Sequence, residues 1–153
     1  MKLYLCDLTH EIGLRTRVVP LGIATLACAI KDGVGDKVST KLFVYPKKII
    51  EEIKANPPDV IALSNYIWNS KLSLKIASIA KKINPNVLTI MGGPHARPDS
   101  QGLKNFLKKH QFIDVYIPFE GEAPFANLIE TCLRKNSYKI QELGNVPGCY
   151  LNL

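Results

Sequence analysis

Short apolar runs alternate with amphipathic stretches along the chain, and this alternation limits its possible folds more than any other feature. Each apolar run has the length of a strand and is followed by a stretch with helical periodicity. The runs span residues 3–8, 38–45, 60–64, 87–91 and 113–117. Parallel strands need crossover connections, and right-handed crossovers leave helices on both faces of the sheet. The pattern predicts an α/β fold with a doubly wound, five-stranded parallel sheet of the flavodoxin-like or Rossmann-like type.

The same pattern suggests where the domain ends. With 153 residues the chain is long enough for one domain with a substantial core. Residues 145–153 fit neither a helix nor a further repeat of the pattern. We therefore expect one domain over residues 1–144 and a linker over residues 145–153.

The net charge is +7, from 20 Lys and Arg against 13 Asp and Glu, which favours anionic partners. The lysines, however, fall in scattered pairs at positions where helices would face water, as at Lys47-Lys48, Lys81-Lys82 and Lys108-Lys109. The chain also lacks the interleaved aromatic and basic residues of a platform for stacking nucleic-acid bases. Nucleic acid is not an expected partner.

The cysteines favour a reducing compartment. The 4 cysteines form no C-x-x-C pair and no three-cysteine iron–sulfur motif. Cys6, Cys28 and Cys132 lie in apolar runs, where we expect them to be buried. The apolar run after Lys2 is too short for a signal sequence or a membrane span. We expect a cytoplasmic protein without a membrane association.

Residues suited to ligand binding follow the strands at one edge of the predicted sheet. They occupy the segments 7–13, 64–69, 92–95 and 119–122, which hold the single Trp and two of the 3 His residues. In an open parallel sheet, ligands bind outside the carboxyl ends of the strands, where the strand order reverses. The sequence therefore predicts a binding site at this edge.

The residue types at this edge indicate a large, flat ligand with a tail. Gly92 and Gly93 let a bulky group approach the backbone, Ser64 offers a small hydroxyl, and Tyr66 and Trp68 offer broad apolar area. Common nucleotide sites are not expected, because neither G-x-G-x-x-G nor G-x-x-x-x-G-K-[ST] occurs.

Together these segments resemble the cobalamin-binding domain at the N-terminus of cobalamin-dependent radical S-adenosylmethionine enzymes. The similarity covers nearly the whole chain. The matching motifs are Pro20-Leu21-Gly22-Ile23, Pro58-Asp59-Val60-Ile61-Ala62-Leu63-Ser64, Met91-Gly92-Gly93-Pro94 and Glu120-Gly121-Glu122-Ala123-Pro124-Phe125. In that family the corrin ring lies across the carboxyl edge of the sheet and the dimethylbenzimidazole tail enters the interior.

The resemblance implies a set of cobalamin contacts. Ser64, Gly92 and Gly93 would flank the tail, and the segments 20–22 and 120–122 would border the ring. The complete set of expected cofactor-binding residues is Thr9, His10, Pro20, Leu21, Gly22, Ser64, Asn65, Tyr66, Gly92, Gly93, Pro94, Glu120, Gly121 and Glu122.

His10 has two interpretations. Classical cobalamin carriers place a cobalt-ligating His in D-x-H-x-x-G, whereas this chain has Asp7-x-x-His10-x-x-Gly13, with one extra residue before the His. His10 is thus either a metal ligand to cobalt or a loop residue bonded to a neighbour, and the radical enzymes of the family mostly lack the ligand.

The resemblance implies a module rather than a complete enzyme. We expect the chain to hold cobalamin for a C-terminal radical domain that is missing from it, with residues 145–153 leading to that domain. The parent would be a methyltransferase or a related enzyme that also uses a 4Fe-4S cluster and S-adenosylmethionine. No catalytic residue is expected here. The alternative is a stand-alone α/β enzyme that binds a nucleotide or small molecule at the same edge, with Asp7, His10 and Glu120 as its catalytic candidates.

Overall fold

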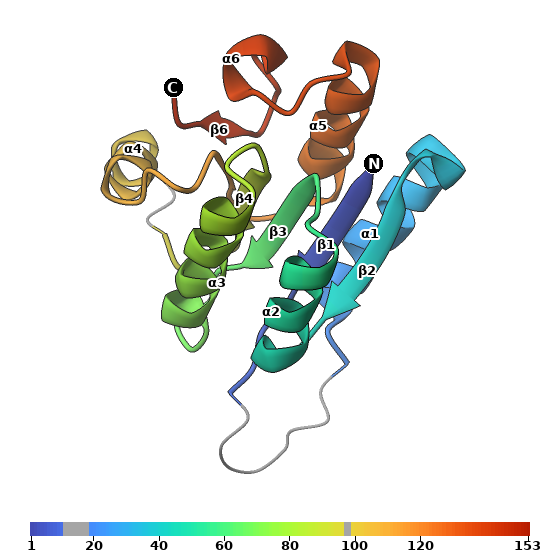
Figure 1. Cartoon of the computed structure of the whole chain (residues 1–153). Coiled ribbons are helices and arrows are strands. Elements are labelled where there is room, and N and C mark those ends of the chain that lie inside the picture. The colour runs from blue at the N-terminus through green and yellow to red at the C-terminus, as the bar shows by residue number, and fades with distance from the viewer. Residues whose placement is uncertain (11–18, 97–98) are drawn as a thin grey trace.

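A single twisted sheet forms the centre of the molecule (Figure 1). The structure is a computed structural model that describes residues 1–10, 19–96 and 99–153. The sheet has 6 strands in the order β2-β1-β3-β4-β5-β6, and the first five are mutually parallel. The strands span Lys2–Cys6 (β1), Ser39–Phe43 (β2), Val60–Ser64 (β3), Leu88–Gly92 (β4), Val115–Ile117 (β5) and Tyr150–Leu151 (β6).

Helices cover both faces of the sheet (Figure 1). α1 and α5 share one face, where buried Ile23, Ile30 and Phe125 join an apolar cluster with the sheet. α2, α3 and α4 cover the other face, where Ile49 and Ile76 belong to a second cluster. The helices span Leu21–Val34 (α1), Pro46–Ala55 (α2), Ser70–Ile83 (α3), Ser100–Lys109 (α4), Glu122–Lys135 (α5) and Ile140–Leu143 (α6), with a 3-10 turn at Gly35–Lys37. The doubly wound α/β prediction is confirmed.

The predicted number of five strands was wrong, because β6 adds an antiparallel strand to β5. The segment around β6 is tied to the domain. Val146 is buried in the core, and the Asn152 side chain donates to the carbonyl oxygens of Leu107 and Ile113. A strand of two residues is too short to show an alternation of apolar and polar residues, so the sequence pattern could not have predicted it.

α1 ends at Val34, and Gly35 follows with a positive φ of 58°. One local prediction also needs correction. Cys28 was expected to be buried, but it is exposed on the outer face of α1. A mostly apolar helix shows no clear polar stripe, so its outward positions are hard to recognise.

Both chain ends lie at the amino edge of the parallel strands (Figure 1). β1 begins there at Lys2, and β6 runs back toward that edge because it is antiparallel to β5. The carboxyl edge is consequently occupied by the loops that follow β1, β3, β4 and β5. Among the described residues, no helix combines the length and apolar character needed to cross a membrane.

A partly buried polar cluster joins α3 to the sheet. Asp114 Oδ2 accepts hydrogen bonds from the Thr89 backbone N–H at 2.7 Å and the Thr89 hydroxyl at 2.8 Å. The same oxygen lies 2.7 Å from Lys81 Nζ, which also donates to the Val87 carbonyl oxygen. One carboxylate therefore holds the start of β4, the end of α3 and the segment before β5 together.

We expect Asp114→Ala to lower the free energy of unfolding by about 2 kcal/mol, because it leaves the Lys81 ammonium and the Thr89 N–H without this partner. Lys139→Met serves as the control. It removes an exposed pair with Glu142, whose charged atoms are 3.7 Å apart, and should lower the stability much less than Asp114→Ala does. Urea denaturation followed by circular dichroism measures both values. Equal effects would contradict a structural role for Asp114.

Candidate functional site

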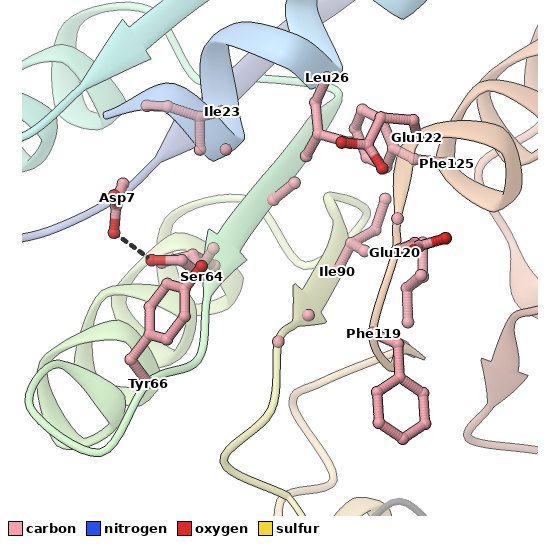
Figure 2. Close-up of a pocket in the computed structure, with 17 residues that line it drawn as sticks. Asp7, Ile23, Leu26, Ser64, Tyr66, Ile90, Phe119, Glu120, Glu122 and Phe125 are labelled. Atoms are coloured by element: carbon pink, nitrogen blue, oxygen red, sulfur yellow. Dashed lines mark hydrogen bonds between the residues drawn. The ribbon is translucent and has the colours of Figure 1, made fainter. Parts of the chain in front are cut away.

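A cavity of about 490 Å³ opens at the carboxyl ends of β1, β3, β4 and β5, between α1 and α5 (Figure 2). This volume lies in the usual range for small-molecule sites. The strand order reverses between β1 and β3, which sends α1 and α2 to opposite faces. The cavity is lined by Asp7, Gly22, Ile23, Leu26, Ala62, Leu63, Ser64, Tyr66, Ile90, Gly92, Gly93, Ile117, Phe119, Glu120, Gly121, Glu122 and Phe125.

The lining changes from apolar to acidic between the interior and the mouth. Every buried residue of the lining is apolar, as in the cases of Ile23, Ile90 and Phe125. Glu120 and Glu122, in contrast, are exposed. Figure 2 shows these two carboxylates on the opposite side of the cavity from Asp7. The lining formed by the described residues includes no Lys, Arg or His.

A polar cluster lies where β1 and β3 end. The Ser64 hydroxyl donates to Asp7 Oδ1 at 2.7 Å (Figure 2). Asn69 Nδ2 donates to Ser64 Oγ at 2.9 Å and lies 3.3 Å from Asp7 Oδ1. Asn69 Oδ1 accepts from the Tyr66 N–H, which fixes the turn between β3 and α3. The Ser64 hydroxyl thus keeps one acceptor lone pair that a ligand could use.

The glycine pair after β4 is required by neighbouring backbone. A Cβ on Gly92 would lie 2.9 Å from the Ile117 carbonyl oxygen, and one on Gly93 would lie 2.8 Å from the Asn65 carbonyl oxygen. Gly93 also has a φ of 125°, which side-chain-bearing residues rarely adopt. Both glycines line the cavity. Because they have no side chains, the cavity wall beside the strand ends is formed there by backbone atoms.

A buried phenol holds this glycine turn from the opposite face of the sheet. The Tyr116 hydroxyl donates to the Gly93 carbonyl oxygen at 2.6 Å and accepts from Asn65 Nδ2 at 2.9 Å. Burial raises the pKa of Tyr116, while hydrogen bonds from Asn65 and the Ala96 N–H oppose the rise. The side chain of Asn65, a predicted cofactor contact, is therefore directed at Tyr116 instead of the cavity.

Phe119 is a lining residue that the sequence did not single out. Its φ is 58°, and its side chain is 67% exposed at the end of the cavity near the loops (Figure 2). A bulky residue with positive φ is a genuine conformational outlier, and such strain concentrates at functional sites. No sequence pattern foretells a left-handed Phe, so only coordinates could show it.

The structure gathers many of the predicted contact residues around the cavity. Those in the lining are Gly22, Ser64, Tyr66, Gly92, Gly93, Glu120, Gly121 and Glu122. The others lie outside the lining: Thr9, His10, Pro20, Leu21, Asn65 and Pro94. Sequence reasoning missed the apolar wall from α1, β3, β4 and α5, because its residues have the same periodicity as ordinary core positions.

His10 is exposed, and its Nε2 lies 3.2 Å from the carbonyl oxygen of Trp68. A ring nitrogen that donates to a carbonyl carries a proton and cannot ligate a metal through that atom. Gly13, the last residue of the motif weighed for this site, lies outside the described residues. In the described part of the chain, no three His, Cys, Asp or Glu side chains gather as a metal site.

Comparison with protein families decides the family of the chain. The family model of the B12 binding domain matches residues 12–129. The chain belongs to the B12 binding domain family. The matched range begins at residue 12, ends within α5 and includes most of the cavity lining.

This B12 binding domain is similar to parts of longer proteins. It is 47% identical over 76 residues to the cobalamin-dependent radical SAM methyltransferase TokK of Streptomyces tokunonensis, covering 50% of this chain and 11% of TokK. It is 42% identical over 72 residues to the 2-(S-pantetheinyl)-carbapenam-3-carboxylate methyltransferase of Streptantibioticus cattleyicolor, covering 47% of this chain and 10% of that enzyme. The chain therefore spans only a small part of the curated relatives it matches.

A solved structure supports the fold of the B12 binding domain. The cobalamin-dependent S-adenosylmethionine radical enzyme OxsB, with aqua-cobalamin and S-adenosylmethionine bound, superposes with a TM-score of 0.69 at 19% identity. The match covers 97% of this chain and 20% of OxsB. At this identity the likeness concerns the fold alone.

We expect Gly93→Ala to lower the free energy of unfolding by about 3 kcal/mol, since the new Cβ combines backbone strain with a close contact to the Asn65 carbonyl oxygen. Gly35→Ala is the matched control. Gly35 also has positive φ, but a Cβ at this position would have no neighbour within 4 Å, so strain alone should cost about 1–2 kcal/mol. Thermal and urea unfolding compare the two. A Gly93 variant as stable as the Gly35 variant would refute the packing role.

Proposed function

We propose that this chain holds cobalamin at the cavity between α1 and α5, as the cofactor module of a longer radical S-adenosylmethionine enzyme. The observation that carries the proposal is the cavity at the carboxyl edge of a B12 binding domain, with a mouth formed by the loops after β1, β3, β4 and β5. The names of the relatives, which include cobalamin-dependent radical SAM methyltransferases, support methyl transfer as the parent's reaction.

The residues present suit the tail of a cobalamin. The apolar interior, including Ala62 and Ile117, would enclose an aromatic base, and Ser64 would offer its free lone pair at the entrance. Tyr66 and Phe119 would lie beside the corrin at the mouth. Cobalamin, when bound, supplies a cobalt centre able to carry a methyl group.

The alternative of a stand-alone nucleotide-binding enzyme has less support. Asp7 is already bonded to Ser64 and Asn69, His10 contacts Trp68 outside the cavity lining, and Glu120 lies across the cavity from Asp7 (Figure 2). These catalytic candidates do not meet around one point. The acidic residues of the lining, which has no basic side chain among the described residues, would also repel a nucleotide phosphate.

The arrangement of the parent protein is part of the proposal. The cofactor domain would include residues 145–153 as well as residues 1–144, because β6 belongs to the sheet and Val146 to the core. A C-terminal radical domain that carries a 4Fe-4S cluster and binds S-adenosylmethionine would follow it. The coverage of 11% of TokK leaves room for such a domain. All 4 cysteines of the chain are free thiols, which suits work in the reducing cytoplasm.

Retention of hydroxocobalamin tests the proposal. We expect the chain to keep a stoichiometric red chromophore through gel filtration, and Ala62→Phe to weaken binding by about tenfold or more because the ring would fill the cavity. Ala55→Phe, at the exposed end of α2, should bind like the wild type. Absorbance titration measures the three affinities. A colourless protein peak for the wild type would rule out the proposal.

The interpretation of His10 has a spectroscopic test. Because its Nε2 is engaged by the Trp68 carbonyl oxygen, we expect His10→Gln to leave the electron paramagnetic resonance spectrum of the bound Co(II) form unchanged. A nitrogen splitting that is present in the wild type and lost in His10→Gln would instead identify His10 as the cobalt ligand. The affinity for cobalamin, measured in parallel, separates ligation from an effect on the loop.

A further inference from the structure

We propose that the cavity selects among corrinoids by the chemistry of their lower base, accepting an apolar base such as 5,6-dimethylbenzimidazole and discriminating against adenine. This inference rests on the proposed function, since it assumes that the corrinoid tail enters the cavity. The supporting observation is that polar side chains are unevenly distributed along the cavity lining.

Among the described residues, the buried part of the cavity lining carries no polar side chain. Ile23 is 4% exposed, Ile90 is 2% exposed and Phe125 is 1% exposed, and all three come from elements that meet between α1 and α5 (Figure 2). Leu26 from α1 completes this part of the wall. A base that enters this part of the cavity would lose its contacts with water and would contact only the carbon atoms of these side chains.

The backbone of the cavity wall is also engaged. The Gly92 carbonyl oxygen accepts from the Asn65 N–H at 2.6 Å, and the Gly93 N–H donates to the Ile117 carbonyl oxygen at 3.2 Å. At the start of α5, the Gly121 carbonyl oxygen accepts from the Phe125 N–H at 2.8 Å. Because these backbone groups already have hydrogen-bond partners within the protein, they would offer a polar base few new hydrogen bonds.

None of the polar side chains in the described lining is buried. Asp7 and Ser64 share a hydrogen bond near the ends of β1 and β3, and they lie apart from Phe125 (Figure 2). Glu120 is exposed. The Glu122 carboxylate lies beside Leu26 and Phe125, but it is exposed and its Oε1 accepts from the Thr25 hydroxyl at 3.0 Å.

The two bases differ in what they would bury. The six-membered ring of 5,6-dimethylbenzimidazole carries only carbon and two methyl groups. The corresponding ring of adenine carries ring nitrogens and an amino group, each of which loses its hydrogen bonds to water in an apolar pocket. One such loss is enough to reduce an equilibrium constant by about tenfold. The cavity should therefore favour the benzimidazole form by at least that factor.

Binding of three corrinoids to the chain tests the selectivity without any activity measurement. Cobalamin, the adenine-containing cobamide and cobinamide, which lacks the base, are titrated separately and followed by absorbance and calorimetry. We expect cobalamin to bind about tenfold or more tightly than the adenine form. Cobinamide should also bind more weakly than cobalamin, because it leaves the apolar wall unfilled.

The outcomes separate this inference from the function on which it rests. Equal affinities for cobalamin and the adenine form would overturn the selectivity while leaving cobalamin binding intact. Equal affinities for cobalamin and cobinamide would also overturn it, because the base would then lie outside the cavity. Failure to bind any of the three would overturn the proposed function itself.

A substitution in the wall gives an independent test. Leu26→Gln keeps a good helix former in α1 and adds an amide beside the buried end, so it should narrow the preference for cobalamin over the adenine form by several-fold. Leu133→Gln on α5 is the matched control, since Leu133 packs against the same core but is not part of the lining. Leu133→Gln should leave the ratio of the affinities for cobalamin and the adenine form at its wild-type value. Thermal melting confirms that both variants are folded before titration.

Discussion

The reversal of strand order between β1 and β3 is the constraint on which the rest of the molecule depends. Right-handed crossovers that leave these two neighbouring strands must pass over opposite faces of the sheet, so α1 and α3 diverge and a gap opens beside the strand ends. α1 and α5 then border that gap on one face (Figure 1). The cavity is therefore a consequence of topology, and the side chains decide only what fits it.

The cavity wall and one hydrophobic core are made by the same residues. Ile23, Ala62, Ile90, Ile117 and Phe125 belong both to the cluster under α1 and α5 and to the lining. An apolar cavity leaves part of this surface without packing partners, which costs stability until a ligand fills it. Binding of an apolar group here would restore the missing packing contacts, so ligand binding and folding stability depend on the same apolar surface.

The sequence predicted most of the architecture and part of the site, for identifiable reasons. Residues 60–64 form a continuous apolar run of strand length, and α3 has an apolar stripe with helical period, so both elements were found. The loops after strands carry distinctive residues, so Ser64, Tyr66 and Gly93 were recognised. The apolar wall was not, because Ile90 in a binding cavity and an isoleucine in a core have the same pattern. The left-handed Phe119, the Asn65–Tyr116 bond and the short β6 depend on tertiary contacts that no local pattern records.

The direction of β6 determines how a following segment can approach the cavity. Since β6 runs antiparallel to β5, Leu153 lies at the amino edge of the sheet, as does Met1 (Figure 1). The cavity opens at the carboxyl edge. A segment attached after Leu153 would therefore have to extend along the height of the strands before it could reach the mouth of the cavity. Such a connection would wrap the outside of the domain instead of extending from its mouth.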